Sequence, residues 1–236
     1  MEPTHGTEAD TSYLLPAAEA RALLDGAPWS RLAILGDSVA EGVTEPYPGY
    51  GAAPWSHHLL TALRAVRPGL RHLGLGRRHL LTAEVRRTQL AEALEFGPDL
   101  VVALCGGNDA LRREFDPDAT ESELHALLAP LAGTGATLVT SGFFDIAANP
   151  HFDERYRSVA RGRLAVLSSR MRAVADRLDA VCLDMGSHPS CQDPSIWSTD
   201  GIHLNARGQA VLGTEIVRGL ARRLRAPAGV RGARDL

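Results

Sequence analysis

Five short apolar runs, each followed by a stretch with helical spacing, constrain the fold of this chain most strongly. The runs lie at 32–35, 70–75, 99–105, 136–140 and 180–184, and the helical stretches lie at 55–67, 82–94, 121–131, 154–178 and 206–224. Strands that alternate with helices in this way are joined by right-handed crossovers and form a parallel sheet covered on both faces. We therefore expect an α/β fold, a three-layer α/β/α sandwich with a five-stranded parallel sheet.

One domain accounts for most of the 236 residues, because no internal repeat and no long linker divides them. We expect this domain to span 31–225. It follows an N-terminal extension, 1–30, with a short helix at 17–24. The tail, 226–236, is rich in Pro, Gly and Arg and is predicted to be flexible.

Charge and hydropathy exclude several classes of function. A net charge of -3 provides no attraction for nucleic acid or an anionic membrane, and no run of 18 apolar residues is present to insert into a bilayer. The first ten residues lack the basic and apolar regions of a signal peptide, so a cytoplasmic location is expected. All 25 basic residues are arginine, and the absence of lysine excludes Schiff-base chemistry and lysine-dependent phosphate loops.

Neither the cysteines nor the histidines indicate a cofactor. Cys105, Cys182 and Cys191 are scattered without metal-ligand spacing, and free thiols are expected, although a bridge between Cys182 and Cys191 stays open. The nine histidines share no ligand spacing with cysteines or carboxylates. We expect no metal and no cofactor.

A serine stands directly after the first apolar run, in the sequence Gly36-Asp37-Ser38. Residues just past the carboxyl end of a parallel strand lie at the rim of the sheet, where open α/β folds bind their ligands. Ser38 is therefore placed as a nucleophile would be. Gly-Asp-Ser is also common in turns and at helix N-caps, so this motif alone leaves a purely structural role open.

An acid and a base stand three residues apart near the other end of the chain, where Asp200 precedes His203. Gly201 between them lets the backbone bend, so that both side chains can reach one side of a loop. A serine hydroxyl becomes a good nucleophile when a histidine takes its proton and a carboxylate orients that histidine. Ser38, His203 and Asp200 can supply these three roles.

Gly106-Gly107-Asn108-Asp109 follows the third apolar run in the same way. In a parallel sheet every strand-to-helix loop falls on one edge, so Ser38, Asn108 and His203 are predicted to converge there. An asparagine amide and backbone N–H groups are the usual donors to a developing oxyanion. Asn108 is placed to be such a donor.

These motifs resemble three of the four sequence blocks of the SGNH, or GDSL-type, hydrolases: Gly36-Asp37-Ser38, Gly107-Asn108-Asp109 and Asp200-x-x-His203. Their order along the chain matches that family too, and the resemblance covers about 31–220. It implies a flavodoxin-like SGNH hydrolase fold. It also implies Ser38 as nucleophile, His203 as general base, Asp200 as its orienting acid, and an oxyanion hole that includes the Ser38 N–H and the Asn108 side chain.

The remaining block of the family departs from its pattern. Family members usually carry a glycine there whose N–H is a third oxyanion donor, whereas this chain has Gly74-Leu-Gly-Arg-Arg-His79. Alignment on the following helix puts His79 at the glycine position, and Gly76 is the alternative donor. We further expect a substrate pocket that includes Asp37, Tyr47, Tyr50, Phe143 and Trp197.

The sequence therefore predicts a serine esterase that acts on a small or medium acyl ester, a small molecule, without nucleic acid or membrane partners. Two alternatives stay open: an acyltransferase that passes the same acyl group to an alcohol or amine, and a ligand-binding module that has lost catalysis. An α/β-hydrolase is disfavoured because Gly36-Asp-Ser-Val-Ala40 is not Gly-x-Ser-x-Gly. A dinucleotide-binding site is disfavoured because no glycine triplet follows a strand and opens a helix.

Overall fold

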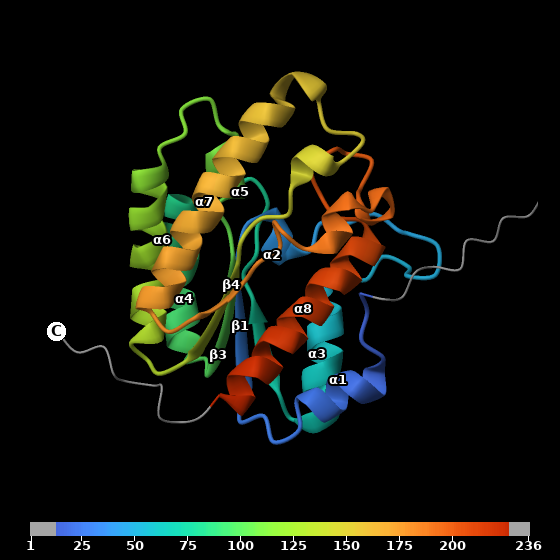
Figure 1. Cartoon of the computed structure of the whole chain (residues 1–236). Helices are drawn as coiled ribbons and strands as arrows, with labels where there is room; N and C mark the ends of the chain where they lie inside the picture. The colour runs from blue at the N-terminus through green and yellow to red at the C-terminus, as the bar shows by residue number, and fades with distance from the viewer. Residues whose placement is uncertain (1–12, 227–236) are drawn as a thin grey trace, which may run out of the picture.

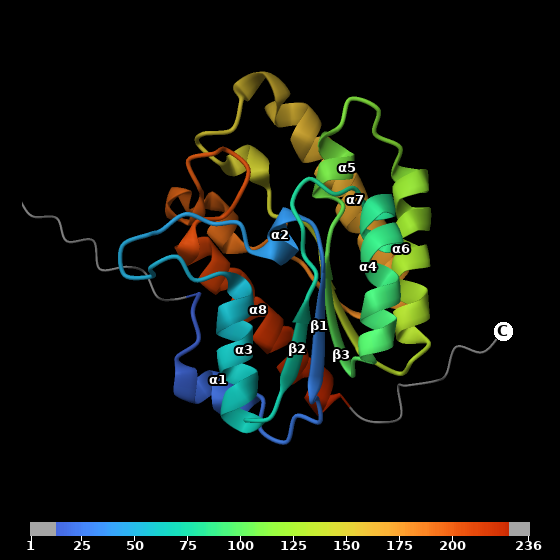
Figure 2. The same ribbon diagram turned by 180° about the vertical axis from the view of Figure 1, so that it is seen from behind.

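The computed structural model of the chain describes residues 13–226. The predictions for 1–12 and for the tail from 227 onward lie outside the described residues. The described chain forms three layers, with a sheet between two groups of helices (Figure 1, Figure 2).

Five parallel strands form the sheet, in the order β2-β1-β3-β4-β5. They are β1 (Arg31–Gly36), β2 (Arg71–Gly74), β3 (Leu100–Leu104), β4 (Thr137–Ser141) and β5 (Val181–Leu183). The central strands β1 and β3 are buried almost throughout, as expected for apolar strands with helices on both faces, whereas the edge strand β2 is mostly exposed. The predicted α/β sandwich with a five-stranded parallel sheet is confirmed.

Two groups of three helices cover the faces of the sheet. One group contains α1 (Ala17–Leu23), α3 (Trp55–Val66) and α8 (Ala206–Arg225), and the other contains α4 (Thr82–Phe96), α6 (Pro117–Ala132) and α7 (Arg157–Arg177) (Figure 1). Shorter helices follow the strands: α2 (Ser38–Glu41) after β1, α5 (Gly107–Leu111) after β3, η1 (Ile146–Ala148) and η2 (Glu154–Tyr156) after β4, and η3 (Pro189–Gln192) and η4 (Pro194–Ile196) after β5.

The helices differ from the prediction mainly where they begin. α6 starts at Pro117, earlier than predicted, because the Asp116 side chain accepts hydrogen bonds from two backbone N–H groups of its first turn. α7 begins at Arg157, after the separate turn η2, which Asp153 caps in the same way. The short helix α5 was not predicted, because five residues are too few to show an apolar period.

Part of the predicted N-terminal extension packs into the core. Helix α1 contacts α3 and α8, and Leu24 and Trp29 are buried. The Trp29 indole also donates a hydrogen bond to Thr137 of β4 at 3.0 Å. The division of the chain into an extension, a domain and a tail stays a prediction.

Candidate active site

The turn after β1 presents Ser38 at the carboxyl edge of the sheet. Gly36 has φ +139°, and a Cβ atom added there would lie 1.9 Å from the carbonyl oxygen of Leu104 in β3. Only glycine allows the two backbones to approach this closely. The chain then turns into α2, which the Asp37 side chain caps by accepting a hydrogen bond from Val39 N at 3.0 Å. Ser38 is the first residue of this helix and remains partly exposed.

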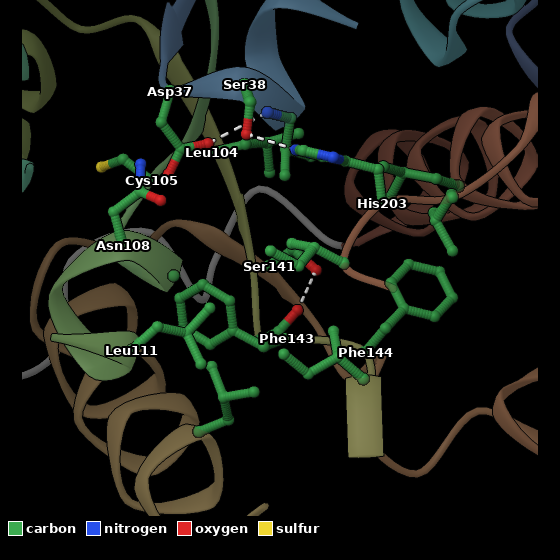
Figure 3. Close-up of a pocket in the computed structure, with 18 of the residues that line it drawn as sticks. Asp37, Ser38, Leu104, Cys105, Asn108, Leu111, Ser141, Phe143, Phe144 and His203 are labelled. Atoms are coloured by element: carbon green, nitrogen blue, oxygen red, sulfur yellow. Dashed lines mark hydrogen bonds between the residues drawn. The ribbon is translucent and has the colours of Figure 1, made fainter. Parts of the chain in front are cut away.

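Ser38, His203 and Asp200 form a continuous chain of hydrogen bonds. The Ser38 Oγ atom lies 2.8 Å from His203 Nε2, and His203 Nδ1 lies 2.6 Å from Asp200 Oδ2. A carboxylate can only accept, so Nδ1 carries the proton and Nε2 is left to accept from the serine hydroxyl. Figure 3 shows Ser38 and His203 facing each other across one end of a cavity.

The loop before α8 holds the acid and the base in position. Ser198 N donates to the His203 carbonyl at 2.9 Å, which closes the loop at its base. The other Asp200 oxygen, Oδ1, accepts from the backbone N–H groups of Ile202 and His203, both at 2.9 Å. Gly201 has φ +83° and lies against the backbone of His151. Asp200 therefore organises the loop with one oxygen and the histidine ring with the other.

The two carboxyl groups near Ser38 differ in their acidity. Burial alone would raise the pKa of Asp200, but hydrogen bonds from His203 and Ile202 outweigh it, so this pKa lies below its usual value. Burial raises the pKa of Asp37 to about 6, although the Val39 N–H and the nearby His203 oppose the shift. Asp200 is thus ionised near neutral pH, whereas Asp37 titrates close to pH 6.

Asn108 lies on α5 and lines the same cavity as Ser38 and His203. Its Nδ2 atom donates to the Leu80 carbonyl at 2.9 Å, which leaves its second N–H free of that bond. The next residue, Asp109, accepts from both the N–H and the hydroxyl of Thr82, each at 2.9 Å. These bonds tie α5 to the start of α4 and hold the Asn108 side chain at the cavity wall.

The cavity includes three of the five predicted pocket residues, namely Asp37, Phe143 and Trp197. Tyr47 and Tyr50 do not line this cavity, and a role for them in binding substrate stays a prediction. Their rings pack against each other at 6.0 Å in the loop after α2, and the Tyr50 hydroxyl is hydrogen-bonded to Arg207. Tyr50 thereby links the loop to α8.

Several apolar residues of the cavity wall were not predicted. They are Leu111, Phe144, Ile146, Leu164, Ile202 and Leu204. Most of them come from the segments that follow β3, β4 and β5. Their position directly after the strands was the only feature of the sequence that could have indicated a place in the cavity wall. Apart from Leu164 of α7, they lie on short helices or in irregular segments, which have no apolar period of their own.

That His79 or Gly76 supplies a third oxyanion donor stays a prediction, and neither residue lines the cavity formed by the described chain. The segment after β2 continues along β1, with Leu75 N bonded to the Ile34 carbonyl and Arg77 N to the Gly36 carbonyl. Gly76 consequently packs on the backbone of α2, where an added Cβ would lie 2.3 Å from a backbone nitrogen. His79 is exposed, with φ +68°.

Among residues 13–226, no group of three His, Cys, Asp or Glu side chains could hold a metal ion, and no helix is long and apolar enough to cross a membrane. Cys105, Cys182 and Cys191 are free thiols in the structure. Ser38, His203, Asp200 and Asn108, together with the apolar cavity, form the candidate site.

Solved structures of other proteins share this fold. No curated protein matches the chain. LAE5, described as an α/β hydrolase enzyme from the metagenome of Lake Arreo in Spain, shares 22% identity over 86% of this chain and 98% of its own, with a TM-score of 0.66. Axe2, an acetylxylan esterase from Geobacillus stearothermophilus, shares 17% identity over 83% of this chain and 94% of its own, with a TM-score of 0.64.

At these identities the two solved structures show a common fold. The family itself is shown by the sequence, which matches the GDSL-like lipase/acylhydrolase model over residues 34–211. That range begins in β1, ends in α8 and includes Ser38, Asn108 and His203. The chain therefore belongs to the GDSL-like lipase/acylhydrolase family and is a serine ester hydrolase.

Proposed function

We propose that the protein hydrolyses a small or medium acyl ester through an acyl-enzyme on Ser38. The observation that carries this proposal is the pair of hydrogen bonds, 2.8 Å and 2.6 Å long, that joins Ser38 Oγ to Asp200 through the His203 ring. This arrangement lets the ring take the hydroxyl proton as the oxygen attacks.

In the first half of the reaction, Ser38 Oγ adds to the ester carbonyl carbon while its proton moves to His203 Nε2. Negative charge develops on the carbonyl oxygen, where the Ser38 N–H and the free N–H of Asn108 are the proposed donors. Collapse of this intermediate breaks the bond to the alcohol oxygen. His203 returns the proton to that oxygen, and the acyl group stays on Ser38.

In the second half, water replaces the alcohol. The Asp200 side chain is 44% exposed and that of His203 is 18% exposed, so the outer edge of the site is open to solvent. His203 takes a proton from the entering water, whose oxygen attacks the acyl carbon, and then protonates Ser38 as the carboxylic acid leaves.

Solved variants of the acetylxylan esterase Axe2 support these assignments. Those described as catalytic mutants replace a serine near its start, and an aspartate and a histidine three positions apart, with alanine. Asp200 and His203 have the same separation. We assign the acid and base roles to them on this likeness and on their contacts with each other and with Ser38.

Covalent labelling tests the proposal. A fluorophosphonate should modify the wild-type protein at Ser38, as located by peptide mass spectrometry. The loss of ester hydrolysis should be proportional to the fraction of protein labelled. Ser38→Ala should abolish both labelling and hydrolysis. Ser122→Ala is a matched control, because Ser122 lies on the exposed face of α6 and its hydroxyl donates to the Asp118 carbonyl. Labelling that survives Ser38→Ala would contradict the nucleophile assignment.

A further inference from the structure

The cavity beside Ser38 has a volume of about 100 Å³ and is lined mainly by apolar side chains. Ser38, His203 and Asn108 stand at one end, and Leu111, Phe143 and Phe144 stand opposite them (Figure 3). Ile146, Leu164 and Trp197 complete the wall. A space of this kind excludes water and favours hydrocarbon.

The side chains of Ser141 and Gln209, which also line the cavity, already have partners. The Ser141 hydroxyl donates to the Gly142 carbonyl at 2.6 Å. The Gln209 amide accepts from Trp55 N and donates to the Val43 carbonyl, both at 3.1 Å. A hydroxyl or charge on a substrate placed there would lose its hydration and gain little in return. The cavity therefore selects an unsubstituted hydrocarbon group.

Phe143 and Phe144 close the far end. Behind them lies a second cavity of about 370 Å³ that contains the charged side chains of Asp145, Arg161 and Asp184, and the two cavities share both phenylalanines. Phe144 packs edge-on against Trp197, with ring centroids 6.1 Å apart. The Phe143 ring packs against the glycines before Asn108, since a Cβ added to Gly106 would lie 3.2 Å from it.

We infer that the cavity holds the acyl group of the substrate, a plain aliphatic chain of about four to six carbons, and that Phe143 limits its length. This inference rests on the proposed function. The alcohol must leave and water must enter past exposed Asp200 and Ile202, so the closed side is left for the group that stays on Ser38. Roughly 150 Å³ of apolar cavity holds six carbons of benzene, so about 100 Å³ holds on the order of four.

Hydrolysis of p-nitrophenyl esters from acetyl to dodecanoyl tests the inference. The wild-type kcat/KM should rise about fourfold per added methylene, peak at butyryl or hexanoyl, and fall beyond. Phe143→Ala should move the peak by two or more carbons, and Phe143→Leu, which removes fewer atoms, should move it less. Phe96→Ala is the matched control, because that ring lies at the end of α4 beneath Arg31 and Arg71.

The outcomes separate this inference from the proposed function. A best rate with acetyl esters, or an equal loss at every length in both Phe143 variants, would overturn the inference and leave ester hydrolysis intact. Titration calorimetry with the Ser38→Ala variant measures its affinity for linear carboxylates, from acetate to decanoate. This readout does not depend on catalysis. If the affinity of the variant peaks at four to six carbons but the wild-type protein hydrolyses no ester, the cavity assignment is supported and the proposed function is contradicted. Binding that is equal at every length would overturn the cavity assignment.

Discussion

The Oγ atom of Ser38 lies 2.8 Å from the Nε2 atom of His203, although 165 positions separate the two residues. Their contact depends on direct links between the segment after α2 and the start of α8. The Ala206 N–H donates to the Glu45 carbonyl at 2.9 Å, and the Glu45 carboxylate accepts from the N–H and hydroxyl of Thr199 at 3.1 and 2.9 Å. These bonds hold the histidine loop beside the serine turn.

His203→Ala is expected to lower kcat by several orders of magnitude, because no other described group contacts Ser38 Oγ to take its proton. Asp200→Asn should lower kcat less than His203→Ala does. Both Asp200 oxygens accept hydrogen bonds, one from the His203 ring and the other from the loop backbone, whereas an amide has a single acceptor oxygen. Asparagine therefore leaves either the ring or the backbone without its acceptor. Steady-state kinetics with circular dichroism as a folding control would measure both. A larger loss in Asp200→Asn would contradict the role assigned to Asp200.

Asn108→Ala is expected to lower kcat about 100- to 1,000-fold with KM nearly unchanged. The reason is that its free N–H would meet substrate charge mainly in the transition state. Loss of the bond to Leu80 could also loosen α5, so Thr82→Val, which removes one of the two Thr82 bonds to Asp109, is the control for α5 position. If Asn108→Ala raised KM and left kcat unchanged, Asn108 would instead bind the ground state.

The strands, the major helices and the edge at which the site forms could be predicted from the sequence, because each depends on local pattern. Apolar runs such as 99–105 need no distant partner to be recognised, and parallel strands bring Ser38 and Asn108 to one edge by geometry alone. The serine and the histidine could therefore be paired before their distance was known.

The rest of the site depends on contacts that no local pattern encodes. Helix α5 is held by the bonds of Asp109 to Thr82, across 27 positions, and the glycines before it gave no helical signal. The contacts of Gly76 with α2 and of Tyr50 with Arg207 could not be predicted, because these partners are distant in sequence. The directions of Phe143 and Phe144 likewise depend on α5 and Trp197.

Asp37→Asn is expected to change how stability depends on pH. The pKa of Asp37 rises from 3.8 to about 6 on folding, so the folded protein holds this proton more tightly than the unfolded chain does. That stabilisation is complete below the unfolded pKa and is lost as the pH rises through about 6. An asparagine can still cap α2, because its amide oxygen accepts from Val39.

Urea unfolding from pH 4 to pH 8 measures this effect. The free energy of unfolding of Asp37→Asn, relative to wild type, should increase by on the order of 3 kcal/mol between pH 4 and pH 7 and then level off. A difference that is constant over this range would show that Asp37 keeps its ordinary acidity in the folded protein.

Gly36→Ala is expected to destabilise the protein by more than about 3 kcal/mol, because a Cβ there would lie 1.9 Å from the Leu104 carbonyl oxygen, and φ is +139°. The close contact and the unfavourable φ both involve the backbone of β1 and β3. This backbone cannot move aside without breaking the hydrogen bonds between the two strands. Gly69→Ala is the matched control, since no atom lies within 4 Å of its added Cβ, and its stability should stay within about 1 kcal/mol of wild type. Equal urea midpoints for the two variants would contradict the close approach of β1 and β3 that presents Ser38.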